Sequence, residues 1–348
     1  MSPSLAPLVL VSLAALILSL RLTRRLATQT GSGFVPLDHP NERSLHTAPV
    51  PRSGGLGVLA GVLLTPLAAL GLGWMEPELA WITGALLLVA LVSFRDDLGD
   101  LSPLARLMAH GLAAGLLMGG GLDWGRLDLP GLTLVFPNWL APVLTGLFVV
   151  WMINLYNFMD GMDGLAGGMA VFGFLALAWF GWRGAESVYA LVCLGVAASA
   201  GGFLFSNFPP ARIFLGDVGS SSLGLLAAAL ALWGTKLGLF PLWVAWLVFS
   251  PFIVDATWTL LARLARGERV WEAHRSHHYQ RLVLAGWSHR KTLLRAYALM
   301  AAVAACAIAT PRLTPADQWM LIGAWTLIYG VIHLMVGLVE RRARIDAR

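Results

Sequence analysis

"LAPVLTGLFVVWMINLYNFMDGMDGLAGG" (residues 140–168) changes character at its middle, where an apolar run gives way to polar side chains. The apolar run, continued to residue 157, has about the length that crosses a membrane (~17–25 residues). Glycines lie among and after the polar residues, which are Asn154, Asn157, Asp160 and Asp163. The stretch therefore predicts a transmembrane helix with a polar cluster at its end.

The composition extends this prediction to the whole chain. Hydrophobic residues make up 57% of the 348 residues and charged residues 12%, and the mean hydropathy is +0.72. An ordinary soluble domain has about a quarter charged residues, which excludes a soluble protein. We expect one all-α domain over 1–348, a polytopic bundle of about eleven transmembrane helices. The expected spans are 4–20, 54–73, 79–94, 103–120, 140–157, 165–182, 186–205, 218–235, 238–262, 293–309 and 318–338.

The basic residues predict the orientation of the bundle. If the N-terminus is periplasmic and the C-terminus cytoplasmic, twenty of the 24 Lys and Arg residues fall on the cytoplasmic side. Such a bias is typical of cytoplasmic loops. This basic face favours contact with anionic membrane lipids and phosphates, and not with nucleic acid. The expected cytoplasmic loops are 21–53, 95–103, 157–165, 206–218 and 263–292.

Acidic and polar residues collect in the same five loops. An Asp at a helix centre costs ~2.5–3.5 kcal/mol on membrane-insertion scales, so acids near the membrane need a reason. In "FRDDLGDLSPLARLMAH" (94–110), the adjacent Asp96 and Asp97 suit Mg²⁺ or a base beside a metal-bound phosphate, and Arg106 follows. An exposed acidic turn is the alternative.

The opening stretch offers a row of polar groups. Asn154, Asn157 and Asp160 are spaced i, i+3, i+6, near one face while a helix persists, and Asp163 extends the row. Gly164 and the glycines after it allow a ligand to approach the backbone closely. A polar helix cap is the alternative explanation.

"SNFPPARIFLGDVGSSSLG" (206–224) places Asp217 just before an expected helix. Glycine and serine at a helix start offer N–H groups to a phosphate. An N-cap role for Asp217 or a following serine explains part of the pattern. It does not explain Asn207, or Phe214, which could stack on a flat base.

Two further loops are cationic. "HPNERSLHTAPVPRSGGLGV" (39–58) would suit a loop that folds over a polyanion, although a solvated basic loop would look the same. Its candidate residues are Asn41, Arg43, His46 and Arg52. "AHRSHHYQRLVLAGWSHRKT" (273–292) would grip a diphosphate with His274, Arg275, His277 and His278, or serve only as a positive membrane anchor. Zinc is disfavoured there because Cys and an H-E-x-x-H pattern are missing.

In their order along the chain, these motifs resemble the polyprenyl-phosphate N-acetylhexosamine-1-phosphate transferases, a family of bacterial membrane enzymes. The resemblance rests on "DHPNERSLHTAPVPRSGG", "DDLGD", "NLYNFMDGMDGLAGG" and "NFPPARIFLGDVGSSSLG". "AHRSHHYQ" departs from the three-histidine run of the peptidoglycan enzyme and is more similar to the branch that starts O-antigen and related surface polysaccharides. "HRSHHYQ" is also similar to members that use deoxy-aminosugars.

The resemblance implies transfer of an N-acetylhexosamine-1-phosphate from a UDP-sugar to undecaprenyl phosphate in the bacterial inner membrane, at its cytoplasmic face. It implies Mg²⁺, with Mn²⁺ as an alternative, held by Asp217 with Asp163 or Asp160. Asp96 or Asp97 would position or deprotonate the lipid phosphate. Asn207 and Phe214 would lie near the uracil, and the histidine segment near the diphosphate and sugar. The sugar and the oligomeric state, a homodimer included, stay open.

Other functions fit less well. Peptidoglycan phospho-MurNAc-pentapeptide transfer is the alternative within the family. A CDP-alcohol phosphatidyltransferase needs an Arg shortly after its first Asp-Gly and further Asp at fixed spacing, and "DGMDGLAGGMAVFG" has neither. A transporter would show internal repeats and charge within its spans.

Overall fold

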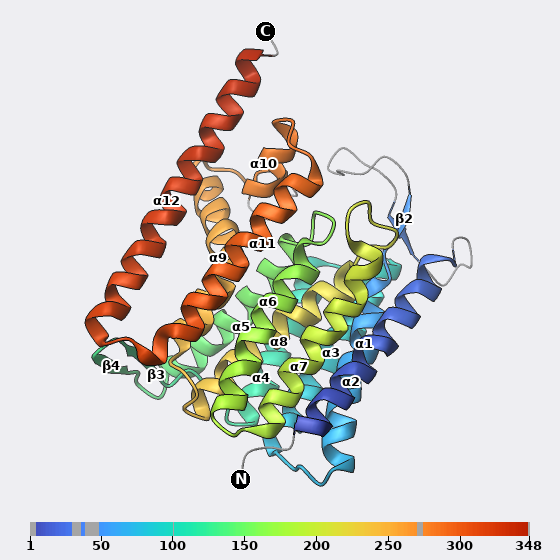
Figure 1. Ribbon diagram of the computed structural model, residues 1–348, viewed down its shortest axis with the longest axis vertical. Coiled ribbons are helices and arrows are strands. Elements are labelled where there is room, and N and C mark those ends of the chain that lie inside the picture. Colours follow the sequence, from blue (N-terminus) through green and yellow to red (C-terminus); the bar gives the residue numbers. More distant parts are fainter. Residues whose placement is uncertain (1–4, 30–35, 39–48, 100, 270–273, 347–348) are drawn as a thin grey trace.

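A computed structural model describes residues 5–29, 36–38, 49–99, 101–269 and 274–346. These residues form a bundle of long helices with two short hairpins (Figure 1), which confirms the predicted all-α architecture. The helices are α1 (Leu5–Ala27), α2 (Gly54–Gly71), α3 (Pro77–Leu98), α4 (Pro103–Gly119), α5 (Leu140–Phe158), α6 (Leu165–Arg183), α7 (Ser187–Asn207), α8 (Gly216–Lys236), α9 (Leu242–Ala265), α10 (His278–Leu284), α11 (His289–Ala309) and α12 (Pro315–Asp346). A 3₁₀ turn, η1 (Thr310–Arg312), joins the last two long helices.

Ten helices in the described ranges are long and apolar enough to cross a membrane. The remaining expected span, 103–120, forms α4, whose 17 residues lie at the lower limit for crossing (~17–25). Several predicted ends were wrong: α3 continues to Leu98 and α12 to Asp346. The apolar run marks the part of a helix that suits lipid, whereas backbone hydrogen bonding continues into polar turns.

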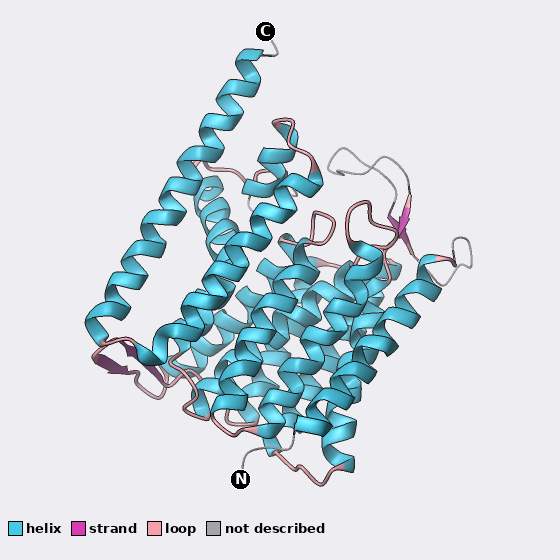
Figure 2. Cartoon of the chain, viewed as in Figure 1, coloured by secondary structure: helices cyan, strands magenta, loops and turns pink. Residues whose placement is uncertain are grey.

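Two antiparallel hairpins lie at opposite ends of the bundle (Figure 2). β1 (Leu37–Asp38) pairs with β2 (Val50–Pro51) in the first loop, with Leu37 opposite Pro51. β3 (Arg126–Leu129) pairs with β4 (Leu132–Val135) in the connection between α4 and α5. The sequence predicted neither hairpin, because each strand is too short to show an alternating pattern.

Helix α8 is the centre of the bundle and is almost wholly buried. It packs against α2, α3 and α5. Its Gly219 lies so close to Gly55 of α2 that a Cβ on Gly55 would come within 2.2 Å of the Gly219 nitrogen. Small residues permit such approach of backbones where no hydrophobic effect drives helices together in lipid. The first turn of α8 is therefore fixed in the middle of the bundle end where the polar loops gather.

Helix α12 is the opposite case. It runs along the edge of the bundle in Figure 1, is mostly exposed, and packs most extensively against the short α10. Leu327 and Leu334 of α12 are among its most exposed side chains. Such faces suit contact with lipid, so α12 adds little to the core of the bundle.

Candidate active site

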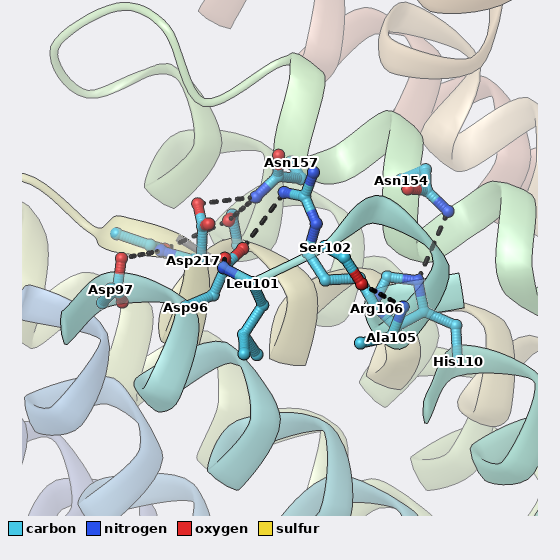
Figure 3. A network of polar contacts seen from close by, with 12 residues as sticks. Asp96, Asp97, Leu101, Ser102, Ala105, Arg106, His110, Asn154, Asn157 and Asp217 are labelled. Atoms are coloured by element: carbon cyan, nitrogen blue, oxygen red, sulfur yellow. Dashed lines mark hydrogen bonds and ion pairs between the residues drawn. The ribbon is translucent and has the colours of Figure 1, made fainter. Parts of the chain in front are cut away.

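The carboxyl ends of α3 and α5 meet the first turn of α8 at one end of the bundle. They bring together Asp96 and Asp97 from α3, Asn157 from α5, and Asp217 from α8. In Figure 3 these four residues lie on one side of a polar network. We call Asp96, Asp97 and Asp217 the carboxylate cluster.

Asp97 caps α8 from a neighbouring helix. Its Oδ1 accepts a hydrogen bond from the Asp217 backbone N–H (3.1 Å), and its Oδ2 accepts one from Val218 (3.1 Å). These donors belong to the first turn, whose N–H groups have no partner inside the helix. Gly216 makes this contact possible: it has φ of 74°, and a Cβ there would lie 2.4 Å from the Arg52 carbonyl oxygen. The alternative explanation of this motif, a local cap by Asp217 or a following serine, therefore does not apply to α8, which Asp97 caps from another helix.

Arg52 pairs with two members of the cluster. Its Nη2 lies 2.7 Å from Asp97 Oδ1 and 3.5 Å from Asp217 Oδ1. Backbone hydrogen bonds fix the chain on both sides of Arg52. The Phe214 N–H donates to the Pro51 carbonyl (2.7 Å), and the Gly54 N–H donates to the Phe214 carbonyl (2.9 Å). Burial lowers the pKa of Arg52, but the charges of Asp97 and Asp217 outweigh it and raise the pKa above its usual value. Arg52 therefore stays charged in the site.

Asp96 and Asp217 lie beside each other in the network of Figure 3. Asp96 also accepts from the Leu101 N–H (2.8 Å) and from Arg106 Nη1 (3.1 Å). Asp217 accepts from Asn157 Nδ2 (2.9 Å), which also donates to Ser220 Oγ (3.0 Å). Neighbouring ionised carboxylates repel each other, and a bound cation would relieve that repulsion.

Asp160 lies beyond the end of α5, so the predicted continuous helical face from Asn154 to Asp160 is broken after Phe158. Burial, and next the charge of Asp217, raise the pKa of Asp160 well above its usual value, with Arg52 opposing the shift. No described residue donates a hydrogen bond to its side chain. Asp163, in contrast, accepts from the Ala211 N–H (3.0 Å).

Asn154 is separated from the carboxylate cluster. Its Nδ2 donates to the Val150 carbonyl (2.7 Å) and lies 3.4 Å from Nδ1 of the buried His110. Figure 3 shows this pair on the far side of the network from Asp97. Asn154 thus braces α5 against α4, while Asn157 alone reaches the cluster.

Asn207 joins two site loops and is buried. Its Oδ1 accepts from the Gly164 N–H (2.8 Å), and its Nδ2 donates to the Ile213 carbonyl (2.9 Å). Phe214 is half-buried beside this junction. The expected place of Asn207 and Phe214 near a uracil stays a prediction, and the geometry adds a structural task for Asn207.

The histidine loop, residues 274–284, is anchored by a carboxylate that the sequence analysis missed. Asp255 of α9 accepts from the His278 backbone N–H (3.0 Å) and lies 3.3 Å from His277 Nδ1 and 3.2 Å from His278 Nδ1. Asp255 is buried. The signal that could have revealed it is a lone acidic residue inside the apolar run 242–265, since an ionisable residue inside a span indicates a functional site.

His274 differs from the cation expected there. Its Nδ1 accepts from Ser276, by the backbone N–H (3.3 Å), and lies 2.8 Å from the Ser276 hydroxyl. Burial, then the neighbouring His277 and Arg263, lower the pKa of His274 to about 4. We expect a neutral ring at neutral pH that offers an N–H donor and no charge. Arg275 is half-buried next to it.

Tyr279 connects the histidine loop to the loop after α5. Its hydroxyl donates to the Phe158 carbonyl (3.3 Å), and its ring stacks on His277 with centroids 5.8 Å apart. A Cβ on Gly161 would lie 2.2 Å from the same hydroxyl. The two parts of the site therefore share one wall. Of the predicted site residues, Asn41, Arg43 and His46 lie outside the described residues.

The described residues contain no group of three or more His, Cys, Asp or Glu side chains arranged to hold a metal ion. The donor set nevertheless fits Mg²⁺, which usually takes one or two carboxylates and completes its shell with substrate phosphates and water. Asp160 and Asp217 supply such oxygens, and the mutual repulsion of neighbouring carboxylates is what a cation would relieve.

A family model described as glycosyl transferase family 4 matches residues 79–235, which contain the whole carboxylate cluster. A probable undecaprenyl-phosphate N-acetylglucosaminyl 1-phosphate transferase of Bacillus subtilis is 30% identical over 336 residues, covering 96% of this chain and 92% of that protein. The chain belongs to glycosyl transferase family 4.

Two other relatives are similar over most of the chain. A decaprenyl-phosphate N-acetylglucosaminephosphotransferase of Mycolicibacterium smegmatis is 30% identical over 97% of this chain and 90% of that protein. A phospho-N-acetylmuramoyl-pentapeptide-transferase of Synechococcus is 33% identical over 73% of this chain and 77% of that protein. The family 4 match ends before Asp255 and the histidine loop, so it covers one part of the site and leaves the other outside.

Proposed function

We propose that this chain transfers an N-acetylhexosamine-1-phosphate from a UDP-sugar to undecaprenyl phosphate and releases UMP. The observation that carries the proposal is the gathering of Asp96, Asp97 and Asp217 at one end of the bundle, where Arg52 pairs with Asp97 and Asp217 and Arg106 pairs with Asp96. Such a concentration of carboxylates suits a cation-assisted reaction between polyanions. The names of relatives that match nearly the whole chain support a polyprenyl phosphate and an N-acetylglucosamine phosphate.

In the proposed step, an oxygen of the lipid phosphate attacks the sugar-bearing phosphorus of the UDP-sugar. The new phosphorus–oxygen bond forms as the bridging oxygen departs with UMP, which leaves undecaprenyl-diphospho-HexNAc. Because the second pKa of a phosphate monoester is about 6, the nucleophile is largely ionised at neutral pH and needs no strong base. The main task of the protein is therefore to neutralise charge and align the two substrates.

The contacts divide the tasks of the paired aspartates. Asp97 accepts hydrogen bonds from Arg52 and from the start of α8, and so joins α3 to both segments, which is why we assign Asp97 a positioning role. Asp96 has Arg106 beside it near the start of α4. We assign Asp96 and Arg106 to the lipid phosphate, since arginine binds phosphate oxygens in a well-defined geometry.

Asp217 and Asp160 would hold Mg²⁺, or Mn²⁺ in its place. When bound, the ion would neutralise charge on the diphosphate. Asp163, whose Oδ2 accepts a hydrogen bond from Ala211 and lies 4.0 Å from His289 Nδ1, is the alternative to Asp160. Asn157 fixes the orientation of the Asp217 carboxylate by donating to Oδ1.

The remaining roles follow the resemblance. Arg275, His277, His278 and a neutral His274 would contact the diphosphate and sugar, and Phe214 with Asn207 would lie near the uracil. Asn41, Arg43 and His46, which lie outside the described residues, stay candidate substrate-binding residues. We place the site at the cytoplasmic face of the bacterial inner membrane, since most Lys and Arg residues are expected on that side. O-antigen or a related surface polysaccharide would be the product pathway.

The test is a panel of UDP-sugars with undecaprenyl phosphate and purified protein in detergent, scored by UMP release. UDP-N-acetylglucosamine and UDP-linked deoxy-aminosugars should release UMP only when the lipid phosphate and Mg²⁺ are present. Turnover of UDP-MurNAc-pentapeptide instead would favour the peptidoglycan reaction. CMP release from a CDP-alcohol would overturn the proposal.

A further inference from the structure

The last helix, α12, carries ionisable residues on its one inward stripe. Tyr329, His333, Val336 and Glu340 are spaced by four, three and four residues, which places them on one helix face. Val336 on this stripe is buried, whereas Leu334 and Leu338 on other faces are exposed. An ionisable side chain within a spanning helix is costly and indicates a function, so His333 needs an explanation.

His333 contacts the histidine loop directly. Its Nδ1 lies 3.0 Å from Nε2 of His278, and its ring packs on Trp258 with centroids 4.4 Å apart. The other side of the His278 ring faces Asp255, which lies 3.2 Å from Nδ1. The contacts at its two ring nitrogens together fix the orientation of the His278 ring.

Glu340 lies about two turns after His333 on α12 and contacts the same loop. Its carboxylate accepts two hydrogen bonds from Arg281, at 2.9 Å from Nε and 2.7 Å from Nη2. The hydrogen bond to Glu340 raises the pKa of Arg281 above its usual value. A bidentate pair of this kind fixes geometry as well as charge.

Helix α10 needs this support. It has seven residues, and isolated helices shorter than ~12–15 residues are marginal in water. Asp255 accepts a hydrogen bond from His278, the first residue of α10, and α12 packs against the rest of α10. A helix that served only to anchor the chain in lipid would need neither His333 nor Glu340.

We propose that His333 and Glu340 are positioning residues, through which α12 holds the histidine loop in place for sugar-phosphate transfer. The inference rests on the proposed function for its kinetic consequences and on the geometry alone for its structural ones. The helix α12 is then part of the active site through the histidine loop, and not through the carboxylate cluster.

The first experiment compares His333→Phe with His333→Asn. Phenylalanine keeps a ring against Trp258 but cannot hydrogen-bond, whereas the asparagine amide places a polar atom near the position of Nδ1. We expect the kcat for UMP release to fall about tenfold in H333F, with KM for the lipid acceptor unchanged and partial recovery in H333N. Leu334→Ala, at an exposed neighbour, is the matched control. Equal kcat values for H333F and L334A would overturn the proposal.

The second experiment exchanges the charges of the ion pair. R281E and E340R should each lower kcat, and the double variant should recover most of the loss. A double variant no better than the single ones would count against a positioning role for Glu340.

Hydrogen exchange separates this inference from the proposed function. Amides of residues 278–284 should exchange faster in H333F and E340R than in the wild type, while those of α8 stay unchanged. Unchanged exchange in α10 would overturn the inference even in an active enzyme. If the wild type releases no UMP but exchange is still faster in both variants, the positioning contacts are supported and the proposed reaction is rejected.

Discussion

The carboxylate cluster and the histidine loop are built in different ways. The cluster stands at the ends of α3, α5 and α8, where α8 is nearly enclosed and Asp97 ties two of these helices together. The histidine loop stands on a seven-residue helix between two elements, with Asp255 on one side and α12 on the other. One part of the site is thus enclosed by long helices, and the other depends on side-chain contacts from the two helices beside it. The predictions below test that division.

Asp217→Asn should have the largest effect. The change keeps the size of the side chain and its contact with Asn157 but removes the charge expected to hold a cation, so kcat should fall about 10²–10³-fold. UMP release measures the loss, and the thermal midpoint in detergent should remain close to that of the wild type. If turnover is retained, the reaction does not require the Asp217 carboxylate.

Asp255→Ala should come next. The His278 N–H loses its buried acceptor and both histidines lose their partner, so α10 should loosen and kcat should fall about 10–100-fold. Hydrogen exchange should rise in residues 278–284 and not at the start of α8. If exchange rose equally in both regions, the two parts of the site would not be independent.

Asp97→Ala should act on stability as well as on turnover. It removes the cap of α8, a loss of about 0.5–2 kcal/mol in free energy of unfolding, and leaves Arg52 without its nearest partner. Ser102→Ala is the control, because Ser102 caps α4 locally at an exposed position. Denaturation in detergent should show the larger loss for D97A. Equal losses would mean that the tertiary cap does not secure α8.

Asp160→Asn should change stability only slightly, and it should stabilise the protein where Asp97→Ala destabilises it. The pKa of Asp160 is raised in the folded protein, so its favourable contribution exists at low pH and is lost as the pH rises through that raised pKa. The amide cannot ionise, so D160N should melt slightly above the wild type at pH 8, and the gap should close as the pH falls. UMP release should decrease in the same variant.

Asp163→Asn is the control for this prediction. Asp163 accepts a hydrogen bond from Ala211, so its replacement should give no stabilisation at pH 8. A pH-independent gap between D160N and the wild type would show that the charge of Asp160 is not the cause.

The sequence alone predicted the membrane bundle, because apolar runs long enough to cross a bilayer leave few other structures for the chain. It also selected Asp96, Asp97 and Asp217, since acids at the ends of apolar runs are rare and costly. It could not divide their tasks. Asp97 lies 120 residues from the Asp217 N–H that it caps, and no local pattern encodes that contact.

Tertiary structure decided the rest. Asp255 appeared in the sequence as one polar residue in an apolar run, and only packing brought the backbone of His278 within 3.0 Å of it. The same holds for His333, 55 residues from His278 along the chain and 3.0 Å away in space. Hydropathy is a property of each segment by itself, so it can be read along the chain. Hydrogen-bond partners depend on which helices pack together, and that is fixed only when the small residues of α8 allow its neighbours to close around it.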